Sequence, residues 1–519
     1  MRLGALFSRA SAETSLTRRA VWLIAAKTLA FAASFLLPVI LVRQMSVPEF
    51  GLYKQASLVI GSVITVFPLG FAMSAFYFLP REAGRQGAVV FNILIMYLLV
   101  GVLSWLLFAL SPELLLTIFK SGEIAGYSSL IGLTILFGLA SSFLEYVVLA
   151  AGDVRLASVL VLAIQVSRVA LLIGAAAFFG SLTALLNAIL LHGVIQLVMA
   201  LWYLGLRFPR FWRHWNWDLM RAQLAYAIPL GAAGLLAAAQ DDLHNYVVSH
   251  RFDAAAYAIY AVGCIQIPLL YVFRDSVGAV MIARVSALRQ EGRIREIVLV
   301  TARMLRKLAI VMLPIYFLLL VTGRELITLL FTTRYLASWP IFVVNLTLIP
   351  GLFLATAYDP ILRAYPEQFG FLLRTRVVLV AILLGALIWA TGRFGLLGAI
   401  STVVGVTMLE RLIIGIKLIR MLRVTAADWR LLKDVGRVTV AASVAALVAV
   451  ATRLAVATAT PLVALVAVGL AYALAYGVLL AMLNVLMPEE ILLIDRQFER
   501  LGLPLSVRFA ISTRSASET

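Results

Sequence analysis

Cysteine, histidine and charged residues are scarce in this chain. Cys264 is the only cysteine in 519 residues, so a disulfide framework is excluded. The four histidines are scattered and show no metal-ligand spacing. Asp, Glu, Lys and Arg make up 13% of the sequence, about half their share in a soluble domain. We therefore expect no cofactor and no bound metal, and we do not expect a soluble fold.

Enzyme motifs are missing as well. The sequence contains no P-loop, HExxH or GxSxG motif, which argues against ATP-driven or hydrolytic chemistry. A polyprenyl transferase would need two acidic clusters on facing helices, and we find one. A polyprenyl-dependent glycosyltransferase or polymerase would bring a sizeable outer loop, and every predicted outer connection is short. We interpret the protein as a non-enzyme, with a membrane transferase or polymerase as the weakest alternative.

Apolar sequence is what the chain has in abundance. Hydrophobic residues account for 63% of it, and about fourteen segments are long enough to cross a hydrocarbon core of roughly 30 Å. The first segment exceeds the roughly 7–15 residues of a signal-peptide core, so we interpret it as an uncleaved helix. The predicted fold is an all-α polytopic membrane protein. Its predicted spans are 21–42, 55–79, 88–110, 128–150, 157–179, 183–206, 224–248, 256–282, 307–322, 338–358, 374–391, 396–418, 438–457 and 462–486.

The charge that remains is unevenly distributed. Lys and Arg number 43 against 25 for Asp and Glu, a formal net charge of +18. With the N-terminus inside, most of these basic residues fall in the inner connections, which is the pattern of the positive-inside rule. Both termini are then expected in the cytoplasm. The basic excess would face an anionic leaflet, so nucleic-acid binding is not needed to explain it.

A weak internal repeat divides the chain. Phe50-Gly51-Leu52-Tyr53 after the first span matches Tyr257-Ala258-Ile259-Tyr260 after the seventh. This favours two six-helix lobes, as parallel repeats about a central cleft, with two further helices at the C-terminal end. The predicted domains are an N-terminal lobe (1–206), a cytoplasmic interlobe loop (207–223), a C-terminal lobe (224–418), helices 13 and 14 (419–486) and a cytoplasmic tail (487–519).

The seventh predicted span carries a compact polar block, Gln240-Asp241-Asp242-Leu243-His244-Asn245. A charged residue near the centre of a membrane helix costs at least ~2.5–3.5 kcal/mol and therefore faces protein or water. A carboxylate in such a stripe can exchange a proton or a sodium ion as its surroundings change. Asp241, Asp242 and His244 are the candidates for ion coupling. The alternative is a set of interhelical bridges to Lys27 or Arg274.

The chain resembles the Wzx-type flippases of lipid-linked oligosaccharides, in the superfamily that also holds multidrug and toxin extrusion transporters and lipid II flippases. The resemblance covers roughly residues 15 to 487. It rests on the turn Leu41–Tyr53, on Ala227-Ile228-Pro229-Leu230, on Ala256–Tyr260, on Leu329-Leu330-Phe331 before Tyr335, and on Gly395-Leu396-Leu397-Gly398-Ala399. The Asp241-Asp242 pair departs from the single acid expected there.

This resemblance implies a fourteen-helix, two-lobed exporter in a bacterial inner membrane. Its substrate would be an undecaprenyl-diphosphate-linked glycan, moved from the cytoplasmic to the outer leaflet for polysaccharide or O-antigen (lipopolysaccharide) biosynthesis by ion-coupled alternating access. The implied partners are this glycan, a coupling proton or sodium ion, membrane lipids, a polysaccharide polymerase and a chain-length regulator. The alternative is an exporter of the same fold for drugs or lipid II.

A diphosphate head would need cations, and arginine suits it because its planar fork forms paired hydrogen bonds. Arg274, Arg168 and Lys27 lie within predicted spans and are the candidates for binding the anionic head. Each has another interpretation. Arg168 could pair with Glu145 inside one lobe, and Lys27 could be an interfacial anchor. Asp275 is expected to be the local partner of Arg274 or to form an inter-helix bridge. Arg411, beside Glu410, is interpreted as structural.

Overall fold

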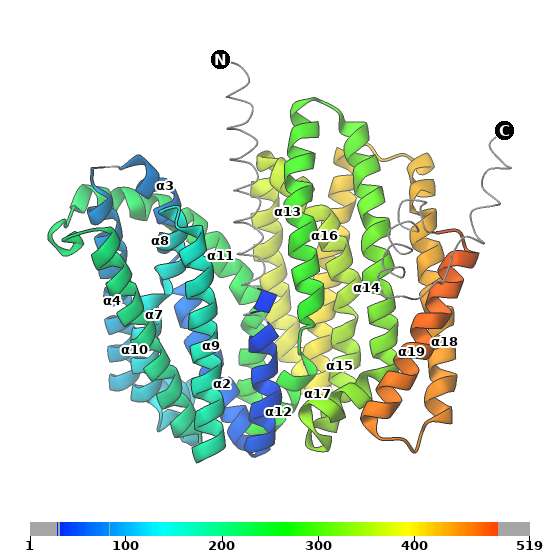
Figure 1. Ribbon diagram of the computed structural model, residues 1–519, viewed down its shortest axis with the longest axis horizontal. Coiled ribbons are helices and arrows are strands. Elements are labelled where there is room, and N and C mark those ends of the chain that lie inside the picture. The colour runs from blue at the N-terminus through cyan, green and yellow to red at the C-terminus, as the bar shows by residue number, and fades with distance from the viewer. Residues whose placement is uncertain (1–27, 30–31, 83, 486–519) are drawn as a thin grey trace. The chain divides into compact units, whose positions relative to one another are not determined.

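The computed structural model describes residues 28–29, 32–82 and 84–485 and is helical throughout that part of the chain, with no strand in it (Figure 1). Nine of the described helices are long and apolar enough to cross a membrane, or up to eleven if two bent pairs each count as one span. The predicted all-α, multi-pass membrane class is therefore confirmed. The count of fourteen stays a prediction.

Contacts group the chain into two compact units. Unit 1 comprises Met1–Pro268 and Leu373–Val403, and unit 2 comprises Leu269–Leu372 and Val404–Thr519. The predicted lobes divide the chain by counting membrane crossings, which is a different criterion. The seventh predicted span, assigned to the C-terminal lobe in that scheme, packs with unit 1.

Unit 1 contains helices that pack along most of their length. In Figure 1 α7 lies beside α4, and it also contacts α10, while the start of α2 packs against α12. A short apolar helix, Ala32–Gln44, precedes them. The elements of unit 1 are α2 (Val47–Val66), η1 (Phe71–Met73), α3 (Ser74–Arg81), α4 (Gln86–Leu110), α5 (Glu113–Phe119), α6 (Gly122–Ala125), α7 (Ser128–Ser142), α8 (Leu144–Ala150), α9 (Val154–Phe179), α10 (Leu182–Arg207), η2 (Phe211–Arg213), α11 (Trp217–Arg251), α12 (Ala254–Gly263) and the stretch Leu373–Val403 of α17 (Phe369–Met421).

The two repeat motifs meet where α2 and α12 begin. Ser46 caps α2 in a reciprocal capping box with Glu49, and the side chain of Asp253 caps α12 by accepting from the Ala256 N–H. A Cβ placed at Gly51 would lie 1.8 Å from the backbone oxygen of Ala254, so only glycine permits this approach. The sequence match between the motifs therefore corresponds to a direct helix–helix contact.

Two spans of unit 1 are broken, and their breaks touch. The span formed by α2, η1 and α3 bends by 41° after Val66, where Leu69 and Gly70 adopt positive φ, and α11 bends by 41° beyond Pro229. Proline at or near both breaks removes a helical hydrogen bond. A Cβ at Gly231 would lie 2.1 Å from the Leu69 oxygen, so backbone meets backbone there.

Unit 2 is built on the long helix α14, which packs against α16, α18 and α19. Figure 1 shows α14, α18 and α19 as neighbours. Near one end of this group, Arg453 of α18 donates to Glu325 of α14 at 2.8 Å, and elsewhere the buried Arg306 donates to the Val485 carbonyl at 2.7 Å. The elements are α13 (Pro268–Gln290), α14 (Ile294–Phe331), η3 (Thr333–Ser338), α15 (Trp339–Leu346), α16 (Leu348–Ala364), η4 (Pro366–Gln368), the later part of α17 (Phe369–Met421), η5 (Ala426–Leu432), α18 (Lys433–Ala455) and α19 (Pro461–Met482).

One connection is shorter than the sequence predicts. The predicted spans 256–282 and 307–322 leave a long basic connection between them, but α13 continues to Gln290 and α14 already begins at Ile294. A short turn with Gly292 in the left-handed region joins them, so the charged residues extend the helices beyond the apolar core. The eleventh and twelfth predicted spans form one element, α17, which is interrupted at Gly395 as the sequence predicts.

Candidate functional site

Two polar clusters lie within membrane-length helices, one in each unit. In unit 1 the α11 block places Asp241 at an exposed position and Asp242 at a half-buried one. Ser62 of α2 donates its hydroxyl to the Asp242 carboxylate at 3.4 Å, and Asn245 hydrogen-bonds to the same group. No described Lys or Arg forms an ion pair with Asp242. This carboxylate is therefore held by neutral partners.

His244 is the buried member of this block. Its Nδ1 lies 2.8 Å from the hydroxyl of Tyr260 on α12, and the two rings meet edge to face. His244 is 8% exposed and Tyr260 is fully buried. The imidazole therefore ties α11 to α12, a role it can fill whether or not it takes part in ion coupling.

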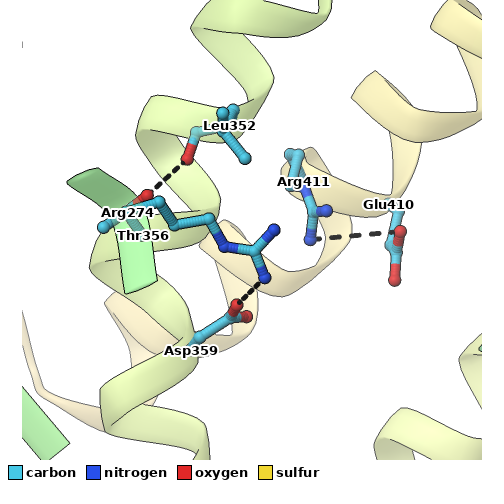
Figure 2. Close-up of polar contacts among 6 residues, drawn as sticks. All are labelled: Arg274, Leu352, Thr356, Asp359, Glu410 and Arg411. Atoms are coloured by element: carbon cyan, nitrogen blue, oxygen red, sulfur yellow. Dashed lines mark hydrogen bonds and ion pairs between the residues drawn. The ribbon is translucent and has the colours of Figure 1, made fainter. Parts of the chain in front are cut away.

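The second cluster lies in unit 2 and joins α13 to α16. Arg274 Nη2 donates to Asp359 Oδ2 at 3.3 Å, and about one third of each side chain is exposed, 31% and 34% (Figure 2). Thr356 lies one turn before Asp359 on α16 and donates to the Leu352 carbonyl at 2.8 Å, so its own hydroxyl bond stays within the helix. The ion pair is thus only partly buried.

A second arginine extends toward this pair from α17. Figure 2 shows Arg411 directed toward Arg274, while its guanidinium lies 4.0 Å from the buried carboxylate of Glu410. A Cβ at Gly415, one turn along α17, would lie 2.8 Å from the Tyr358 hydroxyl, so α16 and α17 approach closely there. Two guanidinium groups and two carboxylates therefore come from three helices of unit 2.

Unit 1 also holds a group of cations. Arg168 on α9 is exposed. It lies close enough to Lys54 of α2 and His192 of α10 for a Coulombic interaction with each. His192 in turn lies 3.3 Å from the Ser167 hydroxyl. Lys27, the third predicted cation, lies outside the described residues.

Sequence reasoning missed two members of these clusters, Asp359 and Lys54. Both stand one residue beyond a predicted span, 338–358 and 55–79 respectively, so hydropathy assigns them to connections. The helices extend further than the apolar runs, since α2 begins at Val47 and α16 ends at Ala364. The side chain of Asp275, the expected partner of Arg274, is not among those described. Within the described part of the chain, no group of three or more His, Cys, Asp and Glu could hold a metal ion.

Comparisons with known proteins support the architecture. Residues 40–340, more than half of the chain, match the family model described as "Polysaccharide biosynthesis protein". No curated protein matches the sequence.

Solved structures share the fold at low identity. The lipid II flippase MurJ in an inward closed conformation is 13% identical with a TM-score of 0.64, covering 88% of this chain and 99% of its own. An inward-facing multidrug resistance MATE transporter of the MOP superfamily is 14% identical with a TM-score of 0.57, covering 76% and 96%. A mutant of the Vibrio cholerae MATE transporter VcmN is 14% identical with a TM-score of 0.51, covering 81% and 100%. At such identities these likenesses establish the fold alone.

Proposed function

Because the chain belongs to the polysaccharide biosynthesis protein family and has the fold of MurJ and the MATE transporters, we propose that it is a flippase for a lipid-linked oligosaccharide. It moves an undecaprenyl-diphosphate-linked glycan from the cytoplasmic to the outer leaflet of a bacterial inner membrane, with both termini in the cytoplasm. Lipid II is the cargo named for one structural neighbour, which supports a polyprenyl-linked substrate by analogy.

The Arg274–Asp359 pair is the observation on which this proposal rests. Each side chain is about one third exposed although both helices are predicted to cross the membrane. Exposure of an ion pair to hydrocarbon is costly, so its open side is expected to face a water-filled pathway. A guanidinium there can offer the planar fork that suits a diphosphate.

Asp359 gives this arginine a resting partner. Without substrate the carboxylate neutralises Arg274 and avoids a lone charge inside the membrane. An arriving diphosphate would compete with Asp359 for the same guanidinium and, carrying more charge, would prevail. We propose Arg168 as a second contact for the anionic head, together with Lys27, and we add Lys54 because it lies near Arg168.

Ion coupling is assigned to the α11 block. Asp242, with only neutral described partners, has no fixed counter-charge, so a proton or a sodium ion can neutralise it. Asp241 is exposed and lies next to it, and His244 links the block to α12. In this scheme ion entry neutralises the acids and resets the transporter after the substrate has left.

The substrate role is tested with Arg274→Ala and Arg274→Lys, measured as polymer export in cells and as binding of a polyprenyl diphosphate to the purified protein. We expect Arg274→Ala to lower binding by about tenfold or more, since a hydrogen bond to a charged group contributes about 1.5–3 kcal/mol. Arg274→Lys should recover part of the loss because its ammonium lacks the bidentate geometry.

Arg453→Ala is the matched control. Arg453 is 35% exposed, close to the 31% of Arg274, and forms an ion pair with the more buried Glu325 in the same unit. Its loss should affect stability at least as much and leave diphosphate binding unchanged. Full export by Arg274→Ala, or equal loss of binding in both variants, would reject the proposed role.

Ion coupling is tested by substrate-driven ion flux in proteoliposomes, comparing Asp241→Asn with Asp242→Asn. Either variant should uncouple flux from substrate movement while substrate still binds. Unchanged flux in both variants would leave the acids as structural groups. Flux driven by an organic cation, but not by a polyprenyl diphosphate, would favour drug export instead.

A further inference from the structure

A basic pocket lies in unit 1, away from the α11 block. It has a volume of about 410 Å³ and is lined by the first turn of α4 with the residues just before it, and by the connection between α10 and α11. Arg85, Arg207, Arg213 and His214 contribute to its wall, and no acidic residue is among the described residues that line it. Such a composition favours an anion.

The pocket is a fixed part of the fold. Phe211 of η2 is buried and packs edge to face against Phe91 of α4. Asn92 of α4 donates to the Asn216 carbonyl and to Gln223 Oε1, both at 3.0 Å. These bonds hold the connection between α10 and α11 against α4, so the backbone that carries the basic side chains is fixed.

The cations of the pocket are only partly neutralised. Arg85 pairs with Glu82 at 3.0 Å, and Arg207 lies 3.4 Å from Asp153. Arg213 and His214 are exposed and form no ion pair with any described carboxylate. The first turn of α4 adds the positive end of its helix dipole. The pocket therefore carries a surplus of positive charge directed into one space.

A second pocket of about 500 Å³ shares Arg207 with the first. Its wall includes Leu206 and Trp202, which are 65% and 58% exposed, and Asp153, the ion-pair partner of Arg207. Arg207 therefore belongs both to a basic pocket and to a partly apolar one. That arrangement suits an amphiphile with an anionic head and an apolar tail.

The tryptophans of this region are typical of the level of lipid headgroups. Trp212, Trp215 and Trp217 are each about half exposed, and the rings of Trp215 and Trp217 stack at 6.2 Å between centroids. Exposed tryptophans gather at membrane–water interfaces, and basic pockets at the ends of transmembrane helices bind anionic headgroups. Free phosphate would use the charge of the pocket but not the apolar wall beside it.

We propose that this pocket binds the phosphodiester headgroup of an anionic membrane phospholipid, with its acyl chains along Trp202 and Leu206. The bound lipid would fasten the start of α4 to the connection between α10 and α11. This site is separate from the transport role proposed above, and it can be tested on protein that carries no glycan substrate.

The test measures retention of phosphatidylglycerol and phosphatidylcholine by the purified full-length chain in detergent, using native mass spectrometry. The pocket variant is Arg85→Gln with Arg213→Gln. Each basic side chain near a headgroup contributes about 1 kcal/mol, about fivefold, so this variant should bind phosphatidylglycerol about 25-fold more weakly.

The matched control is Arg210→Gln with Arg221→Gln. It removes the same charge from the same connection and from the start of α11, at residues that do not line the pocket. We expect it to bind phosphatidylglycerol within about threefold of the wild type. Equal weakening of both double variants would show a general charge effect and overturn the proposal.

Two further outcomes are decisive. Phosphatidylcholine carries no net charge, so all variants should retain it weakly and equally. If the wild-type protein retained phosphatidylcholine as well as phosphatidylglycerol, recognition of an anion would be rejected. If inorganic phosphate stabilised the protein against unfolding to the same extent as phosphatidylglycerol, the pocket would be assigned to free phosphate. If the double variant does not fold, Arg213→Gln alone tests the same site, with about a fivefold loss expected.

Discussion

The α11 block and the Arg274–Asp359 pair accommodate charge within membrane-length helices by different means. Asp242 is surrounded by a hydroxyl and an amide, whereas Arg274 has an opposite charge at 3.3 Å. A carboxylate with neutral partners can lose or gain a proton without leaving another charge uncompensated. In an ion pair, the loss of one charge leaves the other without its counter-charge. The first arrangement suits a group that titrates, and the second a group that changes partners.

The substitution expected to have the largest effect on stability is Asp359→Ala, which tests the difference between the two clusters at the ion pair. It leaves the Arg274 guanidinium without this partner, and we expect a loss of about 1–3 kcal/mol in the free energy of unfolding. That is less than the about 3–5 kcal/mol for a fully buried pair, because one third of each side chain is exposed. Thermal unfolding in detergent measures it. Glu296→Ala, which breaks an exposed pair with Arg293, is the control and should change stability by less than about 1 kcal/mol.

The next largest effect on the free energy of unfolding is expected when the charges of Arg274 and Asp359 are exchanged. Arg274→Asp combined with Asp359→Arg should recover about 0.5–3 kcal/mol relative to the sum of the single variants, since contacting residues couple by that amount. Binding of polyprenyl diphosphate should not recover, because the guanidinium then projects from α16 instead of α13. A double-mutant cycle with both readouts separates stability from recognition. Recovered binding would contradict a position-specific role for Arg274.

Within unit 1 the largest expected single effect is that of Tyr260→Phe. It removes the hydroxyl that meets His244 Nδ1 at 2.8 Å and leaves a buried nitrogen unsatisfied, at a cost of about 1–3 kcal/mol, and we expect the lower end. Tyr53→Phe is the matched control, since its buried ring makes no side-chain hydrogen bond within the described part of the chain. Equal unfolding temperatures for the two variants would argue against the bond to His244.

Ser62→Ala should have the smallest effect. Its hydroxyl lies 3.4 Å from Asp242 Oδ2, a long hydrogen bond, and Asn245 remains as a partner. We expect a change within about 0.5 kcal/mol in unfolding free energy, with Asp242→Asn similar. A loss above about 2 kcal/mol for either variant, in the same detergent assay, would mean that the carboxylate is a structural anchor and would weaken its assignment to coupling.

The sequence predicted the fold class and the break at Gly395, because apolar runs and glycine act locally. It also identified Arg274 and the α11 acids as unusual. It missed Asp359 and Lys54 for one physical reason. A span predicted from hydropathy stops at the first charged residue, whereas a helix continues as long as its backbone hydrogen bonds do. Asp359 comes from 85 residues away along the chain. Local spacing could therefore suggest only Asp275 as the partner of Arg274.

The bond from Arg306 to the Val485 carbonyl has a consequence for biosynthesis. The two residues are 179 positions apart, so most of unit 2 is translated and inserted before this acceptor leaves the ribosome. Domains fold during synthesis as their parts emerge, yet a guanidinium that is 3% exposed cannot settle into its final surroundings until α19 has entered the membrane. Unit 2 should therefore complete its folding late, and a nascent chain halted between α18 and α19 should remain open to proteases around Arg306.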